Sequence, residues 1–161
     1  PAMVLPAGTA ADVMTASPES LPAEASVREA IAFFTDRGFG GAPVVDEQGR
    51  LVGVVSRTDL VTYDREKANY VPAVPGGEEG PEGPLTWEAR GFQVEDVDRT
   101  RVAEIMTPVV YSVRPDTPVQ EVVERMLSLQ VHRLFVVDGE GKLAGVITTL
   151  DILRHLRAGP A

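Results

Sequence analysis

The feature that most constrains this chain is an internal repeat. Shifting the sequence against itself by 92 residues aligns Asp12–Val61 with Glu104–Leu153 without a gap. Identical residues recur along the alignment, among them Met14-Thr15 with Met106-Thr107, Val44-Val45-Asp46 with Val136-Val137-Asp138, and Gly53 with Gly145. A match of this length predicts two copies of one supersecondary unit. Because each copy is too short to bury a stable core easily, we expect the copies to pack together.

The first copy shows the expected elements. Ser26 and Glu29 form a capping box ahead of an apolar stripe at helical spacing, and Gly38 predicts the end of that helix. The apolar runs Ala42–Asp46 and Leu51–Val55 then predict a hairpin, and a second helix is expected from Ser56.

The second copy repeats this order, with Thr117 expected as the helix cap and Pro118 at the first helical position. Each copy therefore predicts strand, helix, strand, strand, helix, which is an α+β fold. The domain boundaries expected are 1–61 for the first repeat, 62–101 for a connector and 102–161 for the second repeat.

The connector breaks the pattern. Val71–Pro84 is rich in Pro and Gly, which predicts an irregular loop. Leu85–Phe92 contains Trp87 and has enough apolar surface to pack against another part of the molecule. Either Trp87 covers the core, which is the favoured interpretation, or the segment is a flap over a ligand cleft.

Composition narrows the function. Twenty-four acidic residues against 15 basic ones give a formal net charge of −9, which disfavours binding to a nucleic acid backbone. Without cysteine, the chain has no disulfide, thiolate zinc site or cysteine nucleophile. With only two histidines and no carboxylate cluster, we expect no catalytic residues and no dedicated metal site.

No apolar run approaches the ~20 residues of a membrane span, so no membrane insertion is expected. Pro1–Gly8 lacks the features of a signal peptide, which predicts a cytoplasmic protein. Because the sequence begins with Pro1 rather than Met, we expect a chain that was processed or cut from a longer parent.

Two segments indicate a possible ligand-binding site: Gly53–Asp59 and Gly145–Asp151. Each runs from a strand end into a helix start. The unpaired amides of a helix start favour an anion, and the hydroxyl of Ser56 or Thr148 can add a hydrogen bond to phosphate. The carboxylate three residues later suits the vicinal diol of a ribose. The competing interpretation is structural, because Ser-x-x-Asp and Thr-x-x-Asp are also capping boxes that need no ligand.

The paired units resemble CBS domains, arranged as a tandem pair or Bateman module of bacterial type. The resemblance covers about Ala11–Val61 and Val102–Leu156 and rests on Met-Thr, Val-Val-Asp and Gly-h-h-Ser/Thr-x-x-Asp recurring in order. It implies two three-stranded sheets about a pseudo-twofold axis, two adenosine-binding clefts between the repeats, and flat homodimers formed through the helices. It also implies regulation of an attached or partner enzyme or transporter rather than catalysis.

The resemblance also implies roles for individual residues. Asp59 and Asp151 match the ribose-binding carboxylate, and Ser56 and Thr148 match the hydroxyl that contacts phosphate. One position further on, Arg57 and Thr149 lie where phosphate is also within reach. Two more positions, Thr15 and Thr107, match the lining of the adenine pocket, although Met-Thr is more often a strand end packed into the core.

One difference between the copies bears on phosphate binding. His132-Arg133 matches a family pair that contacts phosphate in the cleft whose Asp comes from the other repeat, whereas the first copy has Gly40-Gly41 there. The hypothesis is that Ser56, Arg57, Asp59, His132 and Arg133 form the stronger phosphate site. The site of Thr148 and Asp151, facing Gly40-Gly41, is then weaker, empty or selective for a less charged adenosine compound. The alternative is that Arg133 makes a surface ion pair and His132 is solvated. His155 is expected to be a solvated cation at a helix C-terminus.

The leading interpretation is a non-catalytic regulatory module with no required cofactor. Its ligand would be AMP, ADP or ATP, with S-adenosylmethionine or NAD as other adenosine compounds that fit. A second interpretation is a dimerisation or scaffolding module whose clefts stay empty. A hydrolase or transferase is a third, but the sequence offers no credible pair of nucleophile and general base.

Overall fold

The computed structural model describes residues 1–38, 40–69, 99–108 and 111–160. The chain divides into two compact units: unit 1 comprises Pro1–Ser20, Val45–Val52 and Pro108–Ala161, and unit 2 comprises Leu21–Val44 and Gly53–Thr107. Each unit draws on both halves of the chain, so the units and the sequence repeats are different divisions. The loop expected at 71–84 and the Trp87 segment at 85–92 lie outside the described residues.

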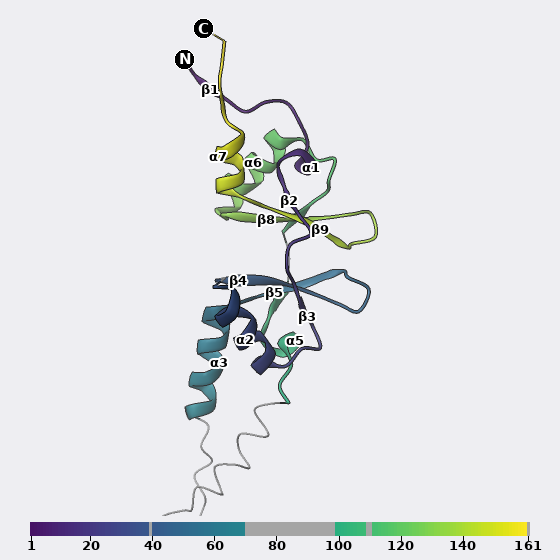
Figure 1. Ribbon diagram of the computed structural model, residues 1–161, viewed down its shortest axis with the longest axis vertical. Coiled ribbons are helices and arrows are strands. Elements are labelled where there is room, and N and C mark those ends of the chain that lie inside the picture. Colours follow the sequence, from purple (N-terminus) through teal and green to yellow (C-terminus); the bar gives the residue numbers. More distant parts are fainter. Residues whose placement is uncertain (39, 70–98, 109–110, 161) are drawn as a thin grey trace, which may run out of the picture. The chain divides into compact units, whose positions relative to one another are not determined.

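Each unit contains one four-stranded sheet, and the strands of the two sheets follow equivalent orders (Figure 1). In unit 1 the strand order is β2 (Thr15–Ala16), β9 (Leu143–Thr148), β8 (Arg133–Val137) and β7 (Ser112–Val113). Strand β8 runs antiparallel to β9 and parallel to β7. In unit 2 the order is β3 (Leu21–Pro22), β4 (Gly41–Val45), β5 (Leu51–Ser56) and β6 (Thr107–Pro108).

The outer strand next to the hairpin comes from the other sequence repeat. Strand β2 belongs to the first repeat, yet Thr15 pairs with Val146 and Ala16 with Gly145 of the second. Strand β6 belongs to the second repeat and borders β5 of the first. The resemblance implied three strands in each sheet, and this exchange of one short strand supplies the fourth.

In unit 2 the helices are α2 (Val27–Arg37), α3 (Arg57–Asn69) and the short α5 (Val102–Ile105). The capping box at the start of α2 is confirmed: Glu29 N–H donates to Ser26 Oγ at 3.1 Å, and Ser26 N–H donates to Glu29 Oε2 at 2.7 Å. Gly38 ends α2 in the left-handed conformation, with φ of 68°. Helix α3 runs into the segment that we predicted as connector.

In unit 1 the helices are α1 (Ala10–Val13), α6 (Val119–Leu129) and α7 (Thr149–His155). The cap predicted for α6 is wrong by one residue: Pro118 is the N-cap, with extended backbone, and Val119 is the first helical residue. The Thr117 hydroxyl instead accepts the Arg114 N–H at 3.0 Å. The Val119 N–H donates to the Gly8 carbonyl at 3.0 Å, so the N-terminal segment caps this helix.

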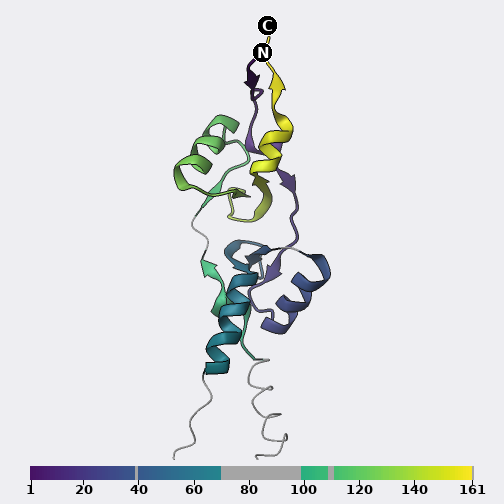
Figure 2. The ribbon, with the colours of Figure 1, turned by 90° about the vertical axis from the view of Figure 1, so that its left-hand side faces the viewer.

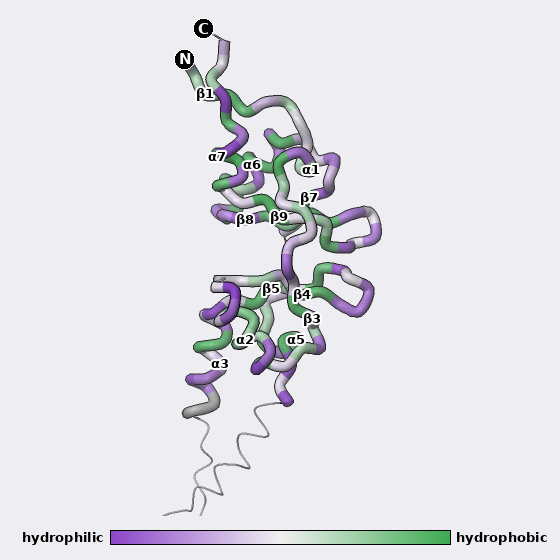
Figure 3. Tube along the Cα trace, in the orientation of Figure 1, coloured by the Kyte–Doolittle hydropathy of each residue, from purple (hydrophilic) through white to green (hydrophobic). Residues whose placement is uncertain are grey.

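The helices of each unit lie on one side of its sheet (Figures 1 and 2), and the core lies between them. In unit 1 the buried cluster joins the N-terminal segment to the second repeat; it contains Ala10, Val13, Val113, Val119, Val122, Met126, Leu134, Val136 and Ile147. Figure 3 shows the hydrophobic strands flanked by hydrophilic hairpin turns. Among the described helices, none has the length and apolar character needed to cross a bilayer.

Asp46 organises the turn between β4 and β5. Its Oδ1 accepts the N–H groups of Gln48 and Arg50, each at 2.9 Å, and its Oδ2 accepts Arg50 Nε at 2.8 Å. The hydrogen bond from the Arg50 backbone is the main reason that the pKa of Asp46 lies below its usual value, while partial burial acts in the opposite direction. Gly49 completes the turn with φ of 78°.

Candidate functional site

The candidate residues gather at two equivalent strand-to-helix junctions, one in each unit. In unit 2, where β5 runs into α3, Asp59 Oδ2 accepts both the N–H of Ser56 at 2.8 Å and its hydroxyl at 3.0 Å. The Asp59 N–H donates to Ser56 Oγ at 3.2 Å. The motif is thus a closed capping box, as its structural interpretation predicts.

The junction in unit 1, where β9 runs into α7, has the same bonds. Asp151 Oδ2 accepts the Thr148 N–H at 2.9 Å and its hydroxyl at 3.0 Å, and Asp151 N–H donates to Thr148 Oγ1 at 3.2 Å. Asp151 is buried, at 7% exposure, and its Oδ1 lies 3.7 Å from Arg154 Nη1. Within the described residues Asp59 Oδ1 takes no hydrogen bond, so each carboxylate uses Oδ2 for the cap and keeps Oδ1 outside it.

A glycine precedes each junction because another segment crosses there. A Cβ built on Gly53 would collide with the Met106 side chain and lie 3.0 Å from the Thr107 carbonyl oxygen. The same holds for Gly145 against Met14 and the Thr15 carbonyl oxygen. The Met-Thr pair of one repeat therefore packs on the motif of the other, which explains why the two signals recur together.

This crossing places two candidate threonines. Thr107 lies in the same unit as Ser56 and Asp59, and Thr15 lies in the same unit as Asp151. Both threonines are exposed, and each is the first residue of a two-residue strand.

The backbone before each hairpin also reaches its junction. Arg57 N–H donates to the Gly40 carbonyl at 3.1 Å, and Thr149 N–H donates to the His132 carbonyl at 3.0 Å. Arg133 pairs with Thr148 across β8 and β9. His132 and Arg133 are exposed and belong to unit 1, together with Thr148 and Asp151, whereas Ser56, Arg57 and Asp59 belong to unit 2.

The Arg57 side chain has a partner that the sequence did not indicate. Its Nη2 donates to the Phe34 carbonyl at 3.3 Å, near the end of α2. The guanidinium thus lies toward a groove between α2 and α3 rather than over the capping box. A contact between residues 23 positions apart leaves no local signal in a sequence.

His155 differs from the expectation in part. It lies in the last turn of α7, as expected for a cation at a helix C-terminus. However, it is half-buried, and its Nδ1 lies 2.8 Å from the Asp151 carbonyl, to which it donates.

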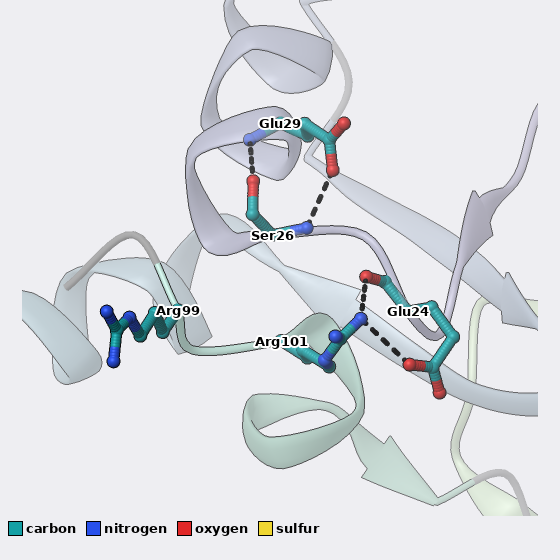
Figure 4. A pocket seen from close by; sticks show the side chains of 5 residues that line it. All are labelled: Glu24, Ser26, Glu29, Arg99 and Arg101. Carbon is teal, nitrogen blue, oxygen red and sulfur yellow. Dashed lines mark hydrogen bonds and ion pairs between the residues drawn. The ribbon is translucent and has the colours of Figure 1, made fainter. Parts of the chain in front are cut away.

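Besides the groove between α2 and α3, a hollow of about 520 Å³ lies near the start of α2. It is lined by Glu24, Ser26, Glu29, Arg99 and Arg101. Figure 4 shows that most of its polar groups already bind each other. Arg101 Nη1 donates to both the carbonyl and the carboxylate of Glu24 at 2.9 Å, while Ser26 and Glu29 form the capping box. Since these bonds serve the fold, the hollow is a weaker candidate than the junctions. The described residues contain no group of three or more His, Cys, Asp or Glu side chains that could hold a metal ion.

The sequence matches the CBS domain family twice, over residues 10–66 and 102–158. This chain is a tandem CBS-domain protein. The matches cover both repeats and most of the described residues, and they agree with the resemblance inferred from the motifs.

Two curated relatives are longer proteins. CBS domain-containing protein CBSX1 from Arabidopsis thaliana is 31% identical over 80% of this chain, which spans 55% of CBSX1. The 5'-AMP-activated protein kinase subunit gamma-3 from Sus scrofa is 30% identical over 85% of this chain, which spans 23% of that subunit. A crystal structure of CBSX2 in complex with AMP is similar, with a TM-score of 0.64 and 27% identity, and covers 91% of this chain and 93% of that one. These tandem CBS-domain relatives support the mixed helix-and-strand architecture.

Proposed function

We propose that this tandem CBS-domain protein is a non-catalytic regulatory module that binds an adenine nucleotide. The observation that carries the proposal is the pair of helix-start carboxylates, Asp59 and Asp151, each held by its cap through one oxygen. The AMP complex of CBSX2 and the kinase-subunit relative support AMP, ADP or ATP as the ligand class.

In this proposal the side chains, rather than the backbone amides, make most of the contacts with the nucleotide. Asp59 Oδ1 would accept hydroxyls of the ribose, and Thr107, in the same unit, would line the adenine pocket. The amides of Ser56, Arg57 and Asp59 already donate within the fold, to Asp59, Gly40 and Ser56 respectively. Phosphate binding would therefore depend on side-chain donors, above all on cations.

The cations proposed for the Asp59 site are Arg57, His132 and Arg133, in the arrangement that the CBS resemblance implies. A specific observation favours a second arrangement: the His132 carbonyl binds Thr149 N–H, so His132 and Arg133 would serve Asp151 in their own unit. A double-mutant cycle in AMP binding separates the two. Arg133→Ala should be non-additive with Asp59→Ala in the first arrangement and with Asp151→Ala in the second.

The regulatory mechanism would be conformational. A nucleotide that contacts both repeats stabilises one arrangement of the module, and a partner enzyme or transporter detects the difference. We further propose a cytoplasmic homodimer formed through the helices, which expose Leu127, Leu150 and Leu153. Sedimentation equilibrium measures the dimer; Leu127→Glu with Leu153→Glu should shift it to monomer.

The competing function is a scaffold with empty sites, favoured by the fully closed capping boxes, which need no ligand to complete them. Thermal shift against AMP, ADP, ATP, NAD and S-adenosylmethionine discriminates, because a ligand that binds only the folded state raises Tm. A rise with at least one adenine nucleotide supports the regulatory module, whereas no response to any of the five supports the scaffold.

A further inference from the structure

We propose that Arg57 couples the nucleotide site of unit 2 to the groove between α2 and α3, so that phosphate binding withdraws the guanidinium from the Phe34 carbonyl and from the wall of the groove. The inference rests on the proposed function, because the anion that attracts Arg57 is the nucleotide phosphate.

The Arg57 side chain is one of the side chains that line this groove. The groove has a volume of about 260 Å³, and its lining includes Ile31, Phe34, Leu60, Val61 and Asp64 as well as Arg57. Arg57 Nη2 donates to the Phe34 carbonyl at 3.3 Å, and Asp64 lines the same groove.

The bond that holds Arg57 is weak in three respects. Its length of 3.3 Å exceeds the usual range for N–H···O, and its acceptor is a neutral carbonyl. That same Phe34 carbonyl also accepts the Gly38 N–H at 2.9 Å. Arg57 is moreover exposed, so solvent competes for it.

A phosphate at the start of α3 offers Arg57 a better partner. Arg57 is the first residue of α3 and directly follows Ser56, so its flexible side chain can reach either side of the helix start. Hydrogen bonds between guanidinium and phosphate are shorter and stronger than those to neutral carbonyls. Phosphate binding and the hydrogen bond from Arg57 to the Phe34 carbonyl therefore compete.

Withdrawal of Arg57 changes the character of the helix face. Ile31 is 43% exposed and Val61 58% exposed at this groove, while Leu60 is buried beneath it. The aliphatic stem of an arginine covers apolar surface while its charged head keeps that surface polar. The nucleotide-bound form thus presents a more apolar groove between α2 and α3.

Unit 1 has no arginine at the position that matches Arg57. The positions that match Arg57 and Phe34 there are Thr149 and Met126. The threonine side chain is too short to extend along a helix pair, so only unit 2 transmits phosphate occupancy to its helix face.

Methyl NMR of the full chain, with AMP as the ligand, tests the coupling. Saturating AMP should shift the Ile31, Leu60 and Val61 methyl resonances of the wild type. In Arg57→Ala these methyls should already differ before AMP is added and should move little on saturation, while affinity for AMP falls roughly tenfold. The matched variant Thr149→Ala should keep the wild-type shift of these methyls at saturation, whatever its affinity.

Three outcomes contradict the coupling, and calorimetry on the same samples separates them. If AMP binds the wild type but leaves the groove methyls in place, the coupling is wrong while the nucleotide function stands. The same conclusion follows if Arg57→Ala shows the full wild-type shift. If no adenine nucleotide binds, the coupling and the proposed function both fail.

Discussion

Units 1 and 2 share one framework and differ in the side chains around it. Both have a capping box that holds an aspartate through one oxygen, and both have a glycine crossed by a Met-Thr pair. The cations differ: Arg57 lies beside the junction of unit 2, whereas His132 and Arg133 lie beside that of unit 1. Under the proposed function, the framework would position a ribose in each unit, and the surrounding residues would decide how much phosphate charge each site accepts.

The largest expected effect comes from removing residues 1–16, which the sequence assigns to the first repeat but which complete unit 1. Ala10 is fully buried and Val13 is 5% exposed in the core of unit 1, and β2 pairs with β9. We expect a loss of at least ~3 kcal/mol, comparable to removing a large core side chain. Hydrogen exchange should show β8 and β9 losing protection before β4 and β5.

If the shortened chain does not fold, Val13→Ala gives the milder version of the test. It should cost ~1–2.5 kcal/mol and selectively weaken protection in β8 and β9. Selective loss of protection in β4 and β5 would mean that the segment belongs with the first repeat after all.

The next effect tests whether the two crossings are equivalent. Gly53→Ala and Gly145→Ala should each lower the free energy of unfolding by ~1–3 kcal/mol, because the added methyl meets a methionine side chain and a backbone oxygen. Urea denaturation measures the cost. Gly40→Ala is the control, because nothing lies within 4 Å of a Cβ at that position.

Adding Met106→Ala to Gly53→Ala should recover part of the loss, since it removes the colliding side chain. If Gly53→Ala proves as mild as Gly40→Ala, the close approach of Met106 and the Thr107 carbonyl to Gly53 is wrong.

The smallest effect compares the two hairpin turns. Because the folded pKa of Asp46 is below its unfolded value of about 3.8, its stabilisation is present above pH 4 and is lost as pH falls through the folded pKa. The difference in unfolding free energy between wild type and Asp46→Asn should therefore shrink below pH 4. Asp138 accepts the matching backbone N–H groups, from Glu140 and Lys142, and Asp138→Asn is the comparison. A difference for Asp46→Asn that stays constant from pH 6 to pH 3 would contradict this account.

Local signals predicted much of this structure and long-range ones did not. The capping box at Ser26, the stop at Gly38 and the hairpins follow from short-range chemistry and are confirmed. The exchange of β2 and β6 could not be predicted, because an alignment of repeats shows which segments are alike and not which ones pair. The cap at Pro118 was misplaced because its partner, Gly8, lies far away in the sequence.

In the candidate site, too, short-range features could be predicted from the sequence and long-range contacts could not. The Ser/Thr-x-x-Asp spacing predicted both the capping box and the carboxylates, since both depend on residues three positions apart. The contact of Arg57 with Phe34 and the packing of Met106 on Gly53 link distant segments and had no local signature.

The most direct test of the central claim, that each helix-start aspartate holds a nucleotide, is calorimetric titration of AMP into the wild type, Asp59→Ala, Asp151→Ala and the double variant. If His132 and Arg133 serve the Asp59 site, Asp59→Ala should weaken binding ten- to a hundredfold, as for the loss of ~1.5–3 kcal/mol of hydrogen bonding, and Asp151→Ala should weaken it less. Asp59→Asn, which keeps a cap oxygen, controls for damage to α3. The double variant should bind AMP more weakly than either single variant. Equal losses in the two single variants would remove the asymmetry, and wild-type affinity in the double variant would contradict the claim.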